Sequence, residues 1–234
     1  MFPDARFAAA VEEVPKIVAL SGGAGTTVLD LCCGPGRYAV PFAKHGYAVT
    51  GVDRTPLLLD KARAYATAEQ VDVEWVWEDM RRFARPNAFD LTLSLYTSFG
   101  YFDEPSENRA VLHNVFTSLK AQGVLVLDVA GKEVLARSFQ PTGSQALPNG
   151  DLLIQRRTVV DDWSRLDNEW IIIADGGMRR FRFRHWVYSG HELKELLAGV
   201  GFFPIALYGD FDGAAYGPSA RRLIAVAHKR PGSL

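Results

Sequence analysis

One stretch of the sequence constrains the fold more than any other: residues 28–40, which read Val-Leu-Asp-Leu-Cys-Cys-Gly-Pro-Gly-Arg-Tyr-Ala-Val. Its apolar start predicts a short buried strand that carries Asp30 near its end, followed by a turn with Gly34 and Gly36 before a helix. Glycine has no Cβ, so the turn can adopt positive φ and a ligand can approach the backbone closely. In open α/β sheets, ligands bind beyond the carboxyl ends of the strands. The stretch therefore predicts a ligand site.

A second acidic residue follows at the end of the next predicted strand. Residues 47–53 are a short apolar run that ends in Asp53, 17 positions after Gly36. A carboxylate about 20 residues beyond a glycine turn is expected to reach the ribose of a bound nucleoside. The ligand could be a dinucleotide, since residues 34–39 also fit G-x-G-x-x-[GA], or a sulfonium nucleoside. Asp30 argues against the dinucleotide, because it would repel a pyrophosphate but could hold a cationic amino group.

The residues Asp30-Leu-Cys32-Cys-Gly34-Pro-Gly36 resemble the first motif of the class I S-adenosylmethionine-dependent methyltransferases, acidic-x-Gly-x-Gly-x-Gly. Cys32 stands in place of the first glycine. Further resemblances follow in order at residues 51–63, 78–80, 88–102 and 119–128, so the likeness covers roughly residues 25–130. It implies an α/β, Rossmann-like fold with a mostly parallel seven-stranded sheet and helices on both faces. It also implies S-adenosyl-L-methionine as methyl donor and S-adenosyl-L-homocysteine as product.

The resemblance implies roles for particular residues. Asp30 is expected to hold the amino-acid end of the cofactor, Asp53 the ribose, and Asp79 with Met80 the adenine. The full set of expected cofactor-binding residues is Asp30, Cys32, Gly34, Gly36, Asp53, Arg54, Asp79, Met80 and Leu95. On the loop after the fourth strand, Tyr96, Ser98 and Tyr101 are expected to contact the substrate. Tyr101 is also a candidate catalytic residue, although ordinary aromatic packing would explain it equally well.

The strand and helix alternation changes after Gly131. Strand-like runs at 151–161, 167–174 and 178–188 follow a turn-rich connector at 140–150 and predict an antiparallel meander. We expect residues 136–188 to be an insertion within a single domain, 1–234, that serves as a lid or substrate subdomain. A lid would exclude water and align the acceptor. An oligomerisation surface is the alternative for this segment.

Alternation in the last of these strands separates two kinds of side chain. Arg180, Arg182 and Arg184 fall on one face, and Phe181, Phe183 and His185 on the other. Arg184 is a candidate to bind a substrate carboxylate, with a solvated sheet face as the alternative. His185 is a candidate catalytic base, with a hydrogen-bonded core histidine as the alternative.

The remaining elements follow from periodicity and capping signals. Helices are expected at 4–20, with a bend or break at Pro15, and at 36–45, 56–68 and 105–120; strands are expected at 26–31, 47–52, 72–77, 89–95 and 123–129. Ser189-Gly-His-Glu192 is a capping box that begins a helix ending near Gly199. The resemblance implies that residues 202–208 and 222–228 form a closing antiparallel hairpin.

Composition narrows the class of substrate. The chain has 234 residues, of which 48% are hydrophobic, and 26 basic against 27 acidic residues. Such a chain can bury one large core, and its net charge of −1 gives no field that attracts nucleic acid or anionic lipid. Residues 94–97, Ser-Leu-Tyr-Thr, also lack the two prolines of enzymes that methylate base amines. A small-molecule substrate is favoured over nucleic acid.

The two cysteines and the ends of the chain bear on location. Cys32 and Cys33 are adjacent, which lacks the spacing of a metal site, so no metal is expected and a reducing cytoplasm is favoured. No apolar run approaches about 20 residues, and no basic-then-apolar leader is present, so we expect a cytoplasmic protein with no membrane association. The oligomeric state stays open between monomer and homodimer.

The sequence thus favours a methyltransferase that moves a methyl group to an N or O atom of a small molecule, mainly by in-line positioning. Two alternatives stay open at this point. One is a module that binds S-adenosylmethionine or S-adenosylhomocysteine without turnover. The other is a dinucleotide-dependent oxidoreductase.

Overall fold

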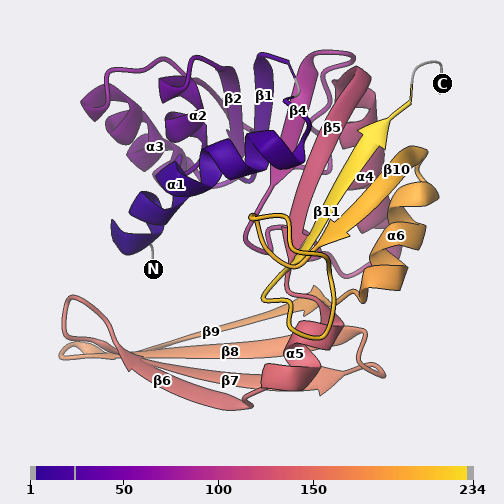
Figure 1. Cartoon of the computed structure of the whole chain (residues 1–234). Helices are drawn as coiled ribbons and strands as arrows, with labels where there is room; N and C mark the ends of the chain where they lie inside the picture. Colours follow the sequence, from indigo (N-terminus) through magenta and orange to yellow (C-terminus); the bar gives the residue numbers. More distant parts are fainter. Residues whose placement is uncertain (1–3, 24, 231–234) are drawn as a thin grey trace.

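The computed structural model describes residues 4–23 and 25–230, and these form two separate sheets (Figure 1). The larger sheet has seven strands in the order β10-β11-β5-β4-β1-β2-β3. Its strands are β1 (Thr27–Leu31), β2 (Ala48–Asp53), β3 (Glu74–Trp77), β4 (Phe89–Ser94), β5 (Leu119–Val129), β10 (Phe202–Tyr208) and β11 (Leu223–Lys229). Neighbouring strands are parallel except that β11 is antiparallel to both β5 and β10. The expected fold class and the closing hairpin are confirmed.

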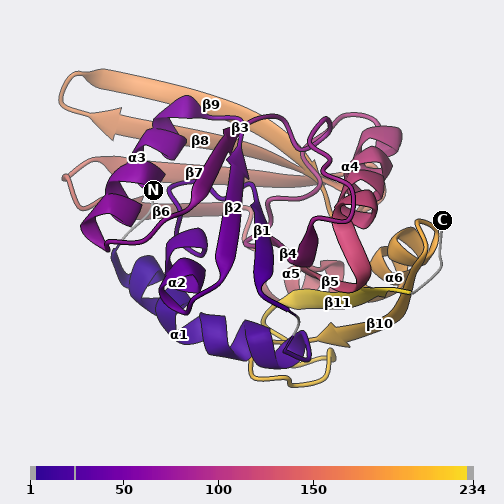
Figure 2. The same ribbon diagram turned by 90° about the horizontal axis from the view of Figure 1, so that it is seen from above.

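Helices cover both faces of this sheet (Figure 2). They are α1 (Asp4–Leu20), α2 (Ala39–Lys44), α3 (Pro56–Ala68), α4 (Pro105–Ser118) and α6 (Gly190–Ala198). Alternate residues of each strand serve opposite faces. Val28 of β1 packs with α1 and α2, whereas its neighbour Leu29 packs with α4 and α6. Strands buried on both faces explain why the sequence shows continuous apolar runs there.

The position of β1 determines where a ligand can bind. β1 is hydrogen-bonded to β2 on one side and to β4 on the other. The chain connections from these strands therefore diverge at the carboxyl end of β1, which opens a crevice there. Asp30 and Leu31 lie at that end.

The smaller sheet consists of β6 (Thr142–Ala146), β7 (Leu152–Val160), β8 (Arg165–Ala174) and β9 (Gly177–Trp186), paired antiparallel in sequence order. It follows a short helix, α5 (Lys132–Ser138), and precedes α6. The sequence predicted only three of these strands. Residues 142–146 lie in the expected connector and become β6 because they pair with β7, from Thr142 with Arg156 to Ala146 with Leu152. Pairing with an existing edge outweighs the turn-like composition.

Some element boundaries also differ from the expectation. α1 continues through Pro15 without a break, and its buried residues Ala10, Val14 and Ile17 pack against the sheet. That packing compensates for the backbone hydrogen bond that proline cannot make. β5 begins at Leu119 rather than 123, because Leu119 pairs with Phe89. The helix expected at 36–45 is confined to 39–44.

The glycine turn offers a test of this packing. Gly36 has φ of 79°, and a Cβ there would lie 3.0 Å from the Trp75 side chain and 3.1 Å from the Ala62 Cβ. Gly46 has a similar φ of 85° but open space around it. We expect Gly46→Ala to lower the free energy of unfolding by about 1–2 kcal/mol through backbone strain, and Gly36→Ala by a further 1–3 kcal/mol, roughly, through overpacking. Urea unfolding of both variants measures the difference, and equal losses would contradict the packing argument.

Candidate active site

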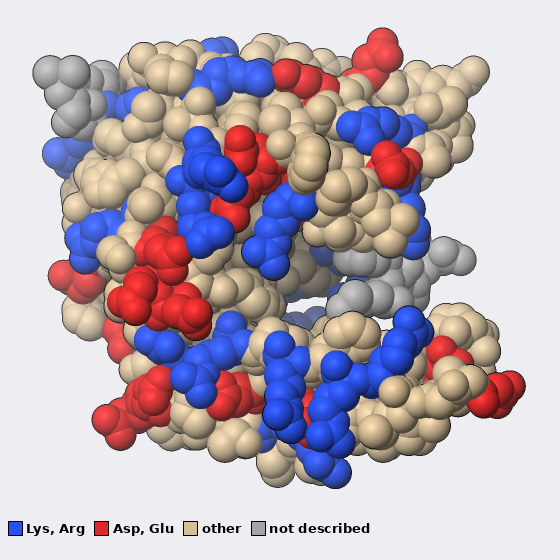
Figure 3. All heavy atoms as spheres, turned by 180° about the vertical axis from the view of Figure 1, so that it is seen from behind, with Lys and Arg blue, Asp and Glu red and all other residues tan. Residues whose placement is uncertain are grey.

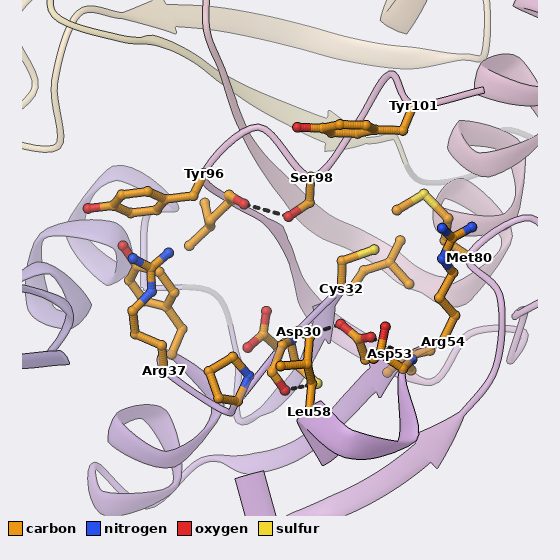
Figure 4. Close-up of a pocket in the computed structure, with 18 of the residues that line it drawn as sticks. Asp30, Cys32, Arg37, Asp53, Arg54, Leu58, Met80, Tyr96, Ser98 and Tyr101 are labelled. Carbon is orange, nitrogen blue, oxygen red and sulfur yellow. Dashed lines mark hydrogen bonds between the residues drawn. The ribbon is translucent and has the colours of Figure 1, made fainter. Parts of the chain in front are cut away.

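A cavity of about 490 Å³ lies at the carboxyl ends of the central strands (Figure 4). Its size falls within the range of small-molecule sites. The lining comes from the ends of β1 and β2, from the loops that follow β1, β2, β3 and β4, and from the first turns of α1 and α3. Of the predicted site residues, the following line it: Asp30, Cys32, Gly34, Asp53, Arg54, Asp79, Met80, Leu95, Tyr96, Ser98 and Tyr101.

Asp30 lies at the floor of the cavity and is 3% exposed. Its Oδ2 accepts one hydrogen bond, from the Ala39 backbone N–H at 3.1 Å. Burial raises the pKa of Asp30 to about 7, although the Arg37 charge and the Ala39 N–H oppose that shift. The carboxylate is therefore incompletely compensated in the protein alone, which suits it to a cationic group of a ligand.

Asp53 joins the glycine turn to the end of β2. Its Oδ2 accepts from the Gly34 N–H at 2.9 Å, and its Oδ1 accepts from the Thr55 N–H at 2.8 Å. Each carboxylate oxygen has a second lone pair, so Asp53 can still receive hydroxyl groups from the cavity. Cys32 has φ of 63°, a left-handed conformation that glycine adopts without strain. This conformation explains why the first motif of the methyltransferase family usually has a glycine where this chain has Cys32.

Arg37 lines the cavity and was not singled out in the sequence. It is 8% exposed, and its guanidinium carbon lies 3.7 Å from the centroid of the Tyr96 ring. Its Nη1 is buried and has no hydrogen-bond partner among the described residues. A buried guanidinium nitrogen without a partner is costly unless a ligand satisfies it. One feature of the sequence could have identified Arg37. A positive charge just before the start of a helix is unfavourable with the helix dipole, so an arginine there indicates a specific partner.

The loop after β4 is held in a strained conformation. Tyr96 and Thr97 both have left-handed φ, 57° and 58°. Asp128 of β5 fixes them, since its Oδ2 accepts from the Tyr96 N–H at 2.8 Å and its backbone oxygen from the Thr97 N–H at 2.9 Å. Arg222, just before β11, pairs with the same Asp128 carboxylate, and its guanidinium carbon lies 4.0 Å from the Tyr96 ring centroid. Such strain persists only where the surroundings enforce it, and it recurs at ligand sites.

The far end of the cavity is formed by residues after β3. Asp79 accepts two hydrogen bonds from the Arg81 guanidinium and one from the Arg81 N–H. The Arg81 guanidinium holds the pKa of Asp79 down, at about 2, so this carboxylate is ionised. Met80 and Arg54 lie on the opposite side of the cavity from Arg37 (Figure 4).

Tyr101 connects the cavity to the second sheet. Its ring lines the cavity, and its centroid lies 6.0 Å from that of Phe183 and 5.2 Å from that of His185, both on β9. His185 is buried and does not itself line the cavity. The two predicted catalytic residues are thus brought into contact. The face of the second sheet that carries Phe183 and His185 is the one turned toward the cavity.

Besides His185, two predicted site residues do not line the cavity. Arg184 is on the opposite face of β9 and pairs with Asp167 and Asp161. Basic side chains cross the second sheet in bands, with acidic ones among them, in Figure 3. Gly36 lies behind the cavity, against Trp75 and Ala62. The sequence in turn did not single out several residues that line the cavity, including Arg6, Arg37, Tyr38 and Leu58.

Comparison with known proteins gives a consistent result. Residues 28–123 match a family model described as a methyltransferase domain. A glycine/sarcosine N-methyltransferase from Aphanothece halophytica is 26% identical over 214 residues, covering 86% of this chain and 76% of that protein. The CcbJ methyltransferase from Streptomyces caelestis superposes with a TM-score of 0.79 over 95% of both chains, at 20% identity. CalS10, an amino pentose methyltransferase from Micromonospora echinaspora solved with S-adenosylmethionine bound, superposes with a TM-score of 0.67 over 96% of this chain and 91% of its own, at 22% identity.

The fold, the cavity and the family match together identify the chain as a class I S-adenosylmethionine-dependent methyltransferase. This sets aside the dinucleotide-dependent oxidoreductase. Within residues 4–23 and 25–230, no helix is long and apolar enough to cross a membrane. The same residues contain no group of three or more His, Cys, Asp or Glu side chains arranged to hold a metal ion.

The pKa of Asp30 leads to a prediction about stability. In the unfolded chain this carboxyl ionises near pH 3.8, and in the folded protein at about 7. Between these values the unfolded state binds fewer protons, so stability falls as pH rises, by about 4 kcal/mol in total. We expect Asp30→Asn, which keeps an acceptor for the Ala39 N–H, to raise the melting temperature of the ligand-free protein at pH 8, with a smaller rise at pH 5.

Asp90→Asn is the matched control. Burial alone would raise the pKa of Asp90, but hydrogen bonds from Thr27 and Lys120 outweigh it and hold the pKa below its usual range. This substitution should lower the melting temperature at pH 8. Thermal unfolding across pH 5 to 8 compares the two variants. An Asp30→Asn variant less stable than wild type at pH 8 would show that the Asp30 carboxylate is fully stabilised without a ligand.

Proposed function

We propose that this methyltransferase transfers a methyl group to an N or O atom of a small molecule held between the loop 96–102 and the face of β8 and β9 turned toward it. The observation that supports this most is Tyr101, because its ring lines the cavity and also contacts Phe183 and His185. A molecule beside Tyr101 would be close to both the cofactor and the second sheet. On this proposal, the predicted insertion 136–188 acts as the substrate-binding subdomain.

The residues of the cavity fit the cofactor. We propose that Asp30 holds its amino group and that the unpartnered Nη1 of Arg37 holds its carboxylate. These charges are close enough for Arg37 to lower the pKa of Asp30, as two groups binding one amino-acid moiety must be. Asp53 is placed to receive the ribose hydroxyls, and Asp79 with Met80 the adenine. Bound there, the cofactor supplies an electrophilic methyl group on a sulfonium.

The protein's own contribution is then mainly positional. Asp128 and Arg222 fix Tyr96 and Thr97, and with them the backbone that carries Ser98 and Tyr101. The second sheet excludes water from the side of Tyr101 that faces it. Holding two reactants in line removes several kcal/mol of a barrier, roughly, without any proton transfer by the protein. A strong general base is not required where the acceptor is a neutral amine.

The names of the similar proteins are consistent with this class of acceptor. One is named for action on glycine and sarcosine and another for an amino pentose, both small molecules with an amino group. The neutral overall charge of this chain also gives no attraction to nucleic acid.

The proposed function is tested by ligand binding. We expect S-adenosylhomocysteine at 100 times its dissociation constant to stabilise the protein by about 2.7 kcal/mol, which thermal unfolding detects as a higher melting temperature. NAD should give no shift. Stabilisation by NAD alone would reject the cofactor assignment.

The role of Arg37 is tested by a pair of ligands. 5′-Methylthioadenosine has the nucleoside and the sulfur but lacks the amino-acid end. We expect Arg37→Met to weaken binding of S-adenosylhomocysteine by about 10- to 100-fold, as for loss of a charged hydrogen bond, and to change binding of methylthioadenosine little. Arg63→Met, at an exposed ion pair with Asp60, is the control. Isothermal titration calorimetry measures each affinity, and equal losses for both ligands would reject the role.

A further inference from the structure

The side chain of Asn168 on β8 has a defined orientation next to His185. Its Nδ2 lies 3.1 Å from the Leu166 carbonyl oxygen and 3.2 Å from the Nδ1 of His185. Only the NH₂ end of the amide can face a carbonyl oxygen, so this end is identified without ambiguity. Its two hydrogens are then assigned, one to Leu166 and one to His185. Asn168 and His185 are both buried, at 7% exposure each.

This arrangement determines the tautomer of His185. A ring nitrogen that accepts a hydrogen bond carries no proton, so Nδ1 is the unprotonated nitrogen. The proton of the neutral ring is therefore on Nε2. Among the described residues, none is hydrogen-bonded to Nε2 of His185. In this state Nε2–H can donate a hydrogen bond but cannot remove a proton.

The surroundings of the ring keep it neutral. Burial lowers the pKa of His185 to about 4. The groups packed against it are the uncharged Asn168 from β8 and the Tyr101 ring from the loop, and desolvation raises the pKa of the Tyr101 hydroxyl. Trp170 adds another donor on the same sheet face, since its Nε1 is buried with no partner among the described residues and its ring contacts Phe183. This face thus consists of aromatic rings with uncharged N–H donors among them.

We propose that Asn168 fixes His185 as an Nε2–H donor, so that the face of the second sheet beside Tyr101 selects an amine acceptor rather than a hydroxyl. This deepens the proposed function and rests on it. An alcohol or phenol would benefit from a base to take its proton, and neither His185 nor Tyr101 can act as one. A neutral amine has a free lone pair and needs none. The Nε2–H of His185 would donate to an oxygen atom elsewhere on the same molecule.

The reaction balances without a base. The nitrogen lone pair forms the N–C bond to the methyl group, the C–S bond breaks, and its electron pair stays on sulfur. The positive charge passes from sulfur to nitrogen. The product is a methylated ammonium ion, which can lose its proton to water after release.

The tautomer can be tested in the full-length protein without any substrate. Long-range ¹H–¹⁵N correlation spectra distinguish the two neutral histidine tautomers and the charged ring. We expect the His185 ring, assigned from its loss in His185→Gln, to stay in the Nε2–H form from pH 8 down to pH 5. An Nδ1–H ring, or a charged ring near pH 7, would overturn the proposal.

The variant Asn168→Asp tests whether residue 168 sets the tautomer of His185. A carboxylate can accept from Nδ1–H, so this variant should change the tautomer to Nδ1–H and raise the pKa of His185 by at least about one unit. Asp167→Asn is the matched control, because Asp167 is on the same strand but pairs with Arg184 on the other face. It should leave the His185 signals unchanged. An unchanged tautomer in Asn168→Asp would count against the role of Asn168.

Acceptor selection is tested with matched probes. Pairs that differ only in the acceptor atom, such as 2-aminocyclohexanol with cyclohexane-1,2-diol, are incubated with S-adenosylmethionine, and S-adenosylhomocysteine formation is measured. Turnover at least tenfold faster with the amines supports the proposal. Equal or faster turnover of the hydroxyl partners, or no turnover of any amine while S-adenosylhomocysteine still binds, overturns it. Loss of S-adenosylhomocysteine binding would instead reject the proposed function.

Discussion

The buried carboxylate of Asp30 is the constraint on which the cavity depends. It lies at the end of the central strand, where the chain diverges toward β2 and β4, and the sheet and helices remove it from water. One backbone N–H and the nearby Arg37 compensate it only in part, as its raised pKa indicates. A more complete set of partners would stabilise the empty protein but leave nothing for a ligand to satisfy. The site thus gives up stability for binding.

The loop after β4 connects the end of the cavity near Asp30 with the side where the acceptor is proposed to bind. Its two left-handed residues, Tyr96 and Thr97, are fixed by Asp128 of β5, and Asp128 is paired with Arg222, the residue just before β11. The loop is therefore fixed by the neighbouring strand β5 and by the segment that leads into β11, although it is part of neither. The position of Tyr101 is set from both sheets, because Asp128 fixes the loop at Tyr96 and Thr97 while the backbone N–H and the Nε1–H of Trp186 on β9 donate to the carbonyl oxygens of Gly100 and Phe102.

Most of the large sheet could be predicted because the relevant information is local. The continuous burial of β1 and β2, and the acidic residues near their ends, follow from neighbouring residues in the sequence. The features that could not be predicted depend on distant partners. β6 exists because β7 offers an edge, Arg37 is oriented by Tyr96, which comes 59 residues later, and Arg184 is neutralised by Asp167 across a hairpin.

His185 shows the limit of a prediction from residue type. Its place on the apolar face of β9 followed from alternation, but whether it is a base or a donor depends on one amide of the adjacent strand. That amide is within reach because of the register of β8 and β9, in which Leu166 is opposite His185 and Asn168 opposite Phe183. A register shift of two residues would keep His185 on the same face and change the residues opposite it. The turn at Ala174–Gly177, which sets this register, therefore also sets the hydrogen-bonding character of His185. If Asn168 fixes the tautomer as proposed, the acceptor chemistry is determined by the second sheet, separately from the cofactor chemistry of the first.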